Sequence, residues 1–286
     1  MLKVKKIYID SRFKTEDSKS HTDFAYDIGT TCFMEDGTSY YMDDVNIPNS
    51  WYSVEQGVNS KLYIRFVFEA DIYKNADYII DVPSDVYDGD TFTNILKILV
   101  SHIADTFLTI VYDPNRNRLC ITCSGSITQF RIMTDKDLRD PATQWGKDNA
   151  SIDMPNVTIT DYDNLGSINE VIKNYGRSIT YTRGVTYYSG YLDFLRYNNI
   201  YISGNIGEYQ TIGPKGQMTI IRKVPVTAGS GFVKNDRVVN KHDLLGGDKT
   251  TLRTIHFTFH DAWGKIINLN GGHVSLSLVF TNTPQD

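Results

Sequence analysis

Alternating apolar and polar residues recur along the whole chain and predict a protein built mainly of β-strands. The clearest case is Leu252–His260, in which Ile255, Phe257 and Phe259 share one face, because successive side chains of a strand point to opposite sides. We expect this face to lie in the core. Runs of the same kind predict further strands at Phe24–Ile28, Tyr40–Ile47, Leu62–Phe68, Tyr78–Val82, Leu108–Tyr112, Leu119–Cys123, Ile127–Ile132, Ser178–Thr182, Ile200–Ser203, Met218–Val226 and Val274–Phe280.

Helical periodicity is confined to two segments. Between Phe92 and Ile103, apolar residues recur at spacings of three and four behind the cap candidates Asp90 and Thr91. A shorter candidate covers Asn164–Tyr175. We expect each helix to pack its apolar stripe against a core.

The order of these elements predicts a small α+β unit inserted into a larger β framework. Residues 73–160 contain a strand, the longer helix and three short strands, and we interpret the polar stretch 135–154 as an irregular loop at the edge of this insertion. Residues 1–72 and 161–286 are then expected to form one discontinuous β-sandwich. If Phe257 and Trp263 are core residues of that sandwich, replacing either by Ala is expected to cost about 3 to 5 kcal/mol.

Composition limits the class of protein. The chain has 286 residues, of which 41% are hydrophobic and 22% charged, which is typical of globular proteins. A formal net charge of -5 makes nucleic acid an unfavourable partner, because that affinity comes mainly from Lys and Arg contacts to phosphate. We expect no membrane span and no signal peptide, so synthesis in the cytosol or nucleus is predicted. The chain has three cysteines, and we expect no disulfide framework.

Motifs that bind metals elsewhere do not fit here. Cys120 and Cys123 have the spacing of a metal knuckle, but residues three apart on a strand point to opposite faces. His256 and His260 share a face yet lie about 13 Å apart along a strand, too far to hold one ion, and we expect them to be exposed or in a subunit contact. The segment that begins at Asp161 starts like a calcium-binding loop, but it lacks the carboxylate that such a loop requires at its twelfth position.

The remaining polar residues are expected to have structural roles. Asp85, Asp88 and Asp90 are interpreted as turn formers and helix caps, and Ser20 and His21 as surface groups. No phosphate loop, dinucleotide fingerprint, nucleophile elbow or zinc-protease motif is present in the sequence. We therefore predict no catalytic, cofactor-binding or metal site, and no enzyme.

Several phrases of the sequence resemble the penton, or minor capsid, protein of polintons (Maverick elements), adintoviruses and virophages. The phrases near the C-terminus are the most specific part of this resemblance. The phrases are Tyr8–Arg12, Asp23–Ile28, Val45–Glu55, Lys61–Ile64, Ile80–Pro83, Tyr87–Gly89, Tyr201–Ser203, Ile212–Pro214, Arg222–Val226, Phe257–Gly264 and Asn268–Leu278.

This resemblance implies a jelly-roll β-sandwich, five copies of which close a homopentameric ring at an icosahedral vertex beside a double-jelly-roll major capsid protein. It places the protein in the virion, after synthesis in the host cytoplasm, with no small-molecule substrate. The sequence contains no Arg-Gly-Asp segment, so receptor binding by that route is not expected.

Two other classes of protein compete with this interpretation. A viral spike or receptor- and glycan-binding module would also be rich in strands and surface aromatics, and Trp51–Tyr52 or Tyr187–Tyr188 would be its candidate sugar platforms. An enzyme built on a β-sandwich ranks third, because no catalytic residues can be identified for it in the sequence. Oligomeric symmetry separates the first two, since a spike is commonly trimeric and a vertex protein fivefold.

Overall fold

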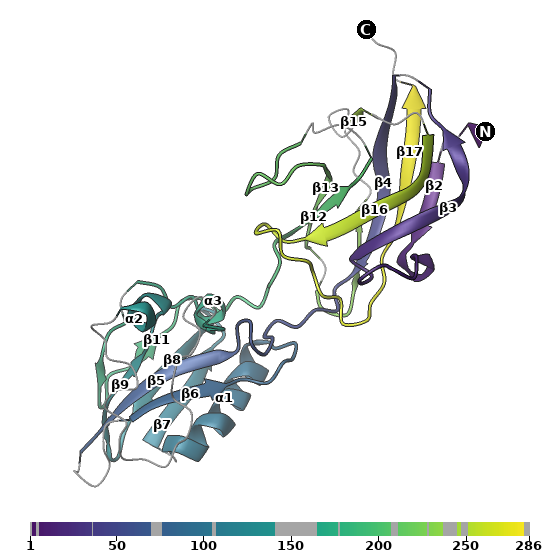
Figure 1. Cartoon of the computed structure of the whole chain (residues 1–286). Coiled ribbons are helices and arrows are strands. Elements are labelled where there is room, and N and C mark those ends of the chain that lie inside the picture. The colour runs from purple at the N-terminus through teal and green to yellow at the C-terminus, as the bar shows by residue number, and fades with distance from the viewer. Residues whose placement is uncertain are drawn as a thin grey trace. The chain divides into compact units, whose positions relative to one another are not determined.

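The computed structural model describes residues 2–3, 6–35, 37–69, 76–104, 107–140, 165–176, 178–206, 211–227, 229–236, 245–246 and 251–282 (Figure 1). The chain forms two compact units. One unit joins Met1–Trp51 to Tyr197–Asp286, and the other is Tyr52–Arg196. The sequence therefore leaves the first unit after Trp51 and returns to it at Tyr197.

The first unit is a sandwich of two antiparallel sheets. Its sheets have the strand orders β3-β16-β12-β13 and β14-β4-β17-β2, with β1 added in parallel beside β3 and β15 paired to β4. The strands are β1 (Leu2–Lys3), β2 (Lys6–Asp10), β3 (Asp23–Phe33), β4 (Thr38–Pro48), β12 (Asn199–Gly204), β13 (Ile220–Pro225), β14 (Val233–Asp236), β15 (Leu245–Gly246), β16 (Thr251–His260) and β17 (Ser275–Asn282).

The connectivity of this sandwich is that of a jelly roll. Taking β2, β3, β4, β12, β13, β14, β16 and β17 as strands one to eight, one sheet has the order two-seven-four-five and the other six-three-eight-one. The first strand therefore pairs with the last, as β2 does with β17. Nested Greek keys of this kind define the jelly roll, and the predicted fold class is confirmed.

Inward-facing alternate residues of both sheets build the core of the sandwich. On β16, Ile255, Phe257 and Phe259 are buried as predicted, and the Phe257 and Phe24 rings lie 5.5 Å apart between centroids. The opposite sheet contributes buried residues such as Met42 and Leu278 to the same cluster. Residues near both ends of the chain thus share one core, because β2 and β17 are neighbours in one sheet.

The described residues of the second unit form two small sheets, one long helix and two short helices. The sheets have the orders β10-β9-β5-β6 and β11-β8-β7, and their inner faces share one buried cluster with helix α1. The elements are β5 (Lys61–Phe68), β6 (Ala76–Asp81), α1 (Gly89–Ala104), β7 (Leu108–Asp113), β8 (Arg118–Cys123), β9 (Ile127–Ile132), α2 (Asp135–Arg139), α3 (Asn169–Ile172), β10 (Tyr181–Thr182) and β11 (Tyr187–Tyr188).

The bounds of this inserted unit differ from the predicted 73–160. Strand β5 was expected in the sandwich, but it pairs with β6 on one side and β9 on the other. Strands β10 and β11 likewise pair with β9 and β8. Backbone pairing between distant segments decides which unit a strand joins, and the alternation within a strand does not reveal its partner.

Helix α1 begins at Gly89, just before its predicted caps Asp90 and Thr91. Asp88 precedes the first residue of the helix. Its carboxylate accepts a hydrogen bond from the Thr91 backbone N–H at 2.8 Å, and its own backbone N–H donates to the Thr91 hydroxyl oxygen at 2.9 Å. This reciprocal pair satisfies two backbone donors at the helix start. Asp90, a predicted cap, lies in the first turn instead.

Two local predictions are corrected in the second unit. The stretch 135–154, predicted to be a loop, begins with the short helix α2, whose Thr134 hydroxyl accepts from the Asp137 backbone N–H; residues 141–154 lie outside the described part. The helix predicted over Asn164–Tyr175 is limited to α3, because Lys173 adopts the left-handed conformation that ends it. Asn164 lies outside the described residues.

No helix in the described ranges is both long and apolar enough to span a bilayer.

Candidate interaction surface

The two cysteines of the apparent metal knuckle lie on opposite faces of β8. Cys123 is buried in the core of the second unit, whereas Cys120 is half-buried on the outer face. The alternation of the strand therefore separates the thiols, as predicted. Among the residues that the structure describes, no group of three or more His, Cys, Asp or Glu side chains is placed to hold a metal ion.

The two histidines of β16 have different surroundings. His256 is exposed and its Nε2 lies 3.0 Å from Oδ1 of Asp23. His260 was expected at the surface or in a subunit contact, but it is buried, stacked on Tyr201, with Nε2 2.8 Å from the Ser203 hydroxyl. The pairing of β16 with β12 explains the difference, since it places Tyr201 directly opposite His260 in the same sheet.

Neither predicted sugar platform presents two neighbouring exposed rings. Trp51 is buried and packs edge-on against Tyr197, with 5.2 Å between ring centroids. Tyr187 is buried against Ile121 of β8 while Tyr188 points outward. Burial without a hydrogen-bond partner raises the pKa of Tyr187 and gives its ring a core role.

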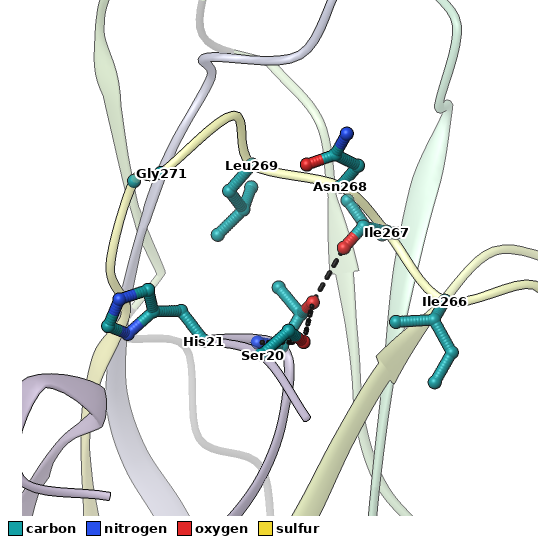
Figure 2. A pocket seen from close by; sticks show the side chains of 9 residues that line it. Ser20, His21, Ile266, Ile267, Asn268, Leu269 and Gly271 are labelled. Atoms are coloured by element: carbon teal, nitrogen blue, oxygen red, sulfur yellow. Dashed lines mark hydrogen bonds between the residues drawn. The ribbon is translucent and has the colours of Figure 1, made fainter. Parts of the chain in front are cut away.

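A small pocket lies at one end of the sandwich, between the β2–β3 and β16–β17 connections (Figure 2). Its volume is about 260 Å³, and its walls are residues 20–22, 266–269 and 271–272. Ser20 and His21, expected to be surface groups, are half-buried parts of this wall. Pockets that enclose drug-sized ligands are usually larger, at about 300 to 1,000 Å³.

The polar groups of this pocket are used to join the two connections. Thr22 donates its hydroxyl to the Ile267 carbonyl at 2.6 Å, and Ser20 Oγ lies 3.0 Å from Thr22 Oγ1 (Figure 2). His21 Nδ1 lies 3.1 Å from Ser11 Oγ, which also accepts a bond from the Val274 N–H. Ser11 is completely buried, so this Ser–His contact holds loops together and offers no accessible nucleophile.

The same β16–β17 connection also holds the end of β4. Ser50 donates to the Leu269 carbonyl at 2.6 Å, and the Asn270 amide donates to the Ser50 carbonyl at 2.8 Å. At Gly272 an added Cβ would lie 2.8 Å from Ser50 Oγ and 2.9 Å from Pro48 Cγ. The connection thus fixes the point at which the chain leaves the sandwich for its insertion.

We predict that Gly272→Ala destabilises the sandwich by about 1 to 3 kcal/mol, because a methyl group has no room against Ser50 and Pro48. Gly229→Ala is the matched control, since its Cβ would meet only Phe232 at an ordinary 3.8 Å. Thermal unfolding of both variants measures the difference. Equal midpoints for the two variants would contradict this account of the close approach.

Two large aromatic side chains of the sandwich, Trp263 and Tyr8, are exposed, and the core predictions did not identify either of them as exposed. Trp263, considered as a core residue, is 62% exposed, because Asp261 Oδ1 accepts from the Trp263 and Lys265 backbone N–H groups and closes a turn that projects the ring outward. Tyr8 lies on β2 between the buried Ile7 and Ile9. The Ile-Tyr-Ile alternation was the signal that could have identified both β2 and its exposed ring.

Comparison with known proteins rests on structure. No protein-family model matches the sequence, and no curated protein matches it either. The crystal structure of the selenomethionine-labelled mavirus penton protein matches this chain with a TM-score of 0.52 at 9% sequence identity, over 96% of this chain and 99% of that one. This chain has the fold of the mavirus penton protein. Because the match covers nearly all of both chains, the sandwich and the inserted unit both correspond to parts of the mavirus penton protein.

Proposed function

We propose that this chain is a structural capsid protein: a penton subunit that forms a homopentameric ring at icosahedral vertices, next to a double-jelly-roll major capsid protein. The observation that carries the proposal is the jelly-roll connectivity with an insertion between β4 and β12, matched along almost the full length of a penton protein. Its place is the capsid vertex of the virion, after synthesis in the host cytoplasm.

The surface of the sandwich agrees with a role in assembly. Large apolar side chains such as Tyr8, Phe13 and Trp263 are mostly exposed in the isolated chain. Aromatic residues of this kind are enriched in the buried centres of protein interfaces. The polar groups around the pocket bond to neighbouring loops instead of converging on a ligand, which favours a non-enzymatic role.

We predict that the purified chain, alone or with its major capsid protein, forms pentamers. Native mass spectrometry gives the copy number and negative-stain images give the symmetry. Fivefold rings support the proposal, since a vertex subunit must match the fivefold axis that it occupies. Trimers would favour a spike or receptor-binding module, and a monomer that never enters capsids would contradict the penton assignment.

A further inference from the structure

Different strands form the two lateral edges of the sandwich. In the described part of the sheets, β2 ends one sheet and β13 ends the other. Figure 1 shows β2 and β3 along one side of the sandwich and β12 and β13 along the opposite side. A cyclic ring is built from head-to-tail contacts, so each copy needs two different and complementary faces.

The first face, here called the β2 edge, consists of Tyr8, Phe13, Glu16 and Asp17. Tyr8 is 72% and Phe13 71% exposed. Phe13 ends the 3-10 turn η1 (Ser11–Phe13) that directly follows β2, so both rings come from one short segment.

The charge of the β2 edge comes from its own loop. Lys14–Asp17 contains two carboxylates and one ammonium group, and both carboxylates are on exposed residues. The neighbouring cations are already paired, because Arg12 Nη2 lies 2.6 Å from Asp10 and Lys19 Nζ lies 3.3 Å from Asp23. The β2 edge therefore offers aromatic rings beside excess negative charge.

The second face, here called the β13 edge, consists of Ile212, Lys215, Met218, Trp263 and Lys265. Ile212 and Met218 are paired across an antiparallel bridge, which puts their side chains on one side, and they are 77% and 53% exposed. This loop is tied to the turn that carries Trp263, because the Gln217 amide donates to the Ala262 carbonyl at 3.3 Å.

Backbone strain marks the loop of the β13 edge. Thr219, next to Met218, has a φ of 65°, a conformation that β-branched residues rarely adopt. Such strain persists only where the surroundings enforce it, and it concentrates at functional sites. Here it accompanies a loop that holds two large apolar side chains in solvent.

The charge of the β13 edge is positive. Residues 211–219 contain no Asp or Glu, and Lys215 and Lys265 are both exposed. The one carboxylate of the adjoining turn belongs to Asp261, which is buried and accepts hydrogen bonds from the turn's own backbone. The two edges therefore match in apolar character and are opposite in charge.

We infer that the β2 edge of one copy binds the β13 edge of the next copy. This inference rests on the proposed function and assigns the contact that closes the ring. A two-fold contact would place each edge against itself and bring like charges together, which is unfavourable. The head-to-tail contact instead buries Tyr8 and Phe13 against Met218 and Trp263, with Glu16 and Asp17 facing Lys215 and Lys265.

Two single-edge variants test the assignment. Phe13→Asp disables the β2 edge and Trp263→Asp disables the β13 edge, and both residues are exposed enough for the fold to tolerate the change. Tyr188→Asp on the exposed face of the inserted unit is the matched control. A far-UV circular dichroism spectrum like that of the unmodified chain, with a cooperative thermal transition, establishes that each variant is folded.

Each single-edge variant is expected to be monomeric by native mass spectrometry at concentrations where the unmodified chain and the control form rings. An equimolar mixture of the two variants is expected to form one-to-one dimers that grow no further, because only one intact β2 edge and one intact β13 edge remain in each pair. Rings that persist in both variants, or a mixture that stays monomeric, would overturn the edge assignment while leaving the pentamer itself established.

Charge reversal gives an independent measurement. Replacing both Lys215 and Lys265 by Glu is expected to raise the dissociation constant of the ring contact at least about tenfold at low salt, with a smaller effect at high salt. Adding Glu16→Lys and Asp17→Lys in the same chain should restore ring formation. Failure of the restoration in a folded protein would refute the pairing of these charges.

If the unmodified chain forms no pentamer in any condition, including with the major capsid protein, the proposed function itself fails.

Discussion

Phe257→Ala is expected to lower the free energy of unfolding of the sandwich by about 3 to 5 kcal/mol. The Phe257 side chain is completely buried, and its ring lies 5.5 Å from that of Phe24 on the neighbouring strand. Truncation removes the transfer free energy of the ring and leaves a cavity that packed strands fill only in part. Urea unfolding followed by far-UV circular dichroism measures the loss.

Trp263→Ala is the matched control for that measurement. Both are aromatic residues near the end of β16, but Trp263 projects into solvent from the turn that follows the strand. At concentrations where the chain is monomeric, its replacement is expected to change the free energy of unfolding by no more than about 0.5 kcal/mol. A large loss for Trp263→Ala, or none for Phe257→Ala, would contradict the placement of these rings.

Arg65→Met is expected to destabilise the inserted unit by about 3 kcal/mol or more. Arg65 on β5 and Asp77 on β6 form a two-pronged ion pair, with Nε–Oδ1 at 2.5 Å and Nη2–Oδ2 at 2.7 Å. The Asp77 carboxylate is almost fully buried, so removing the guanidinium takes a two-pronged ion pair away from a buried charge. Calorimetry of the variant and the unmodified chain measures the difference.

Two further variants make this prediction specific. Replacing Asp77 by Leu in the Arg65→Met background is expected to recover most of the lost stability, because an apolar pair removes the buried charge. Arg183→Met breaks the exposed Arg183–Glu69 pair of the same unit and is expected to cost at most about 1 kcal/mol. Equal losses for Arg65→Met and Arg183→Met would show that burial does not set the cost.

The prediction of β16 and the misplacement of Trp263 have one physical explanation. Within β16, alternation fixed the inward face because neighbouring residues of a strand must point to opposite sides. Trp263 lies in a turn, where no periodicity applies, and hydrogen bonds to Asp261 set its direction. A prediction based on hydrophobicity alone therefore placed Trp263 in the core, although its side chain is exposed.

The amino-acid sequence by itself determined that this protein is strand-rich, which faces of its long strands are buried, and that an α+β unit interrupts a β framework. These properties are local, since side-chain alternation and helical spacing act over a few residues. Tertiary structure alone decided that β5, β10 and β11 join the inserted unit, that β2 pairs with β17, and that two apolar edges of opposite charge lie on opposite sides of one sandwich. Those outcomes depend on pairing between segments far apart in the chain, and that pairing is chosen by the packing of the whole fold.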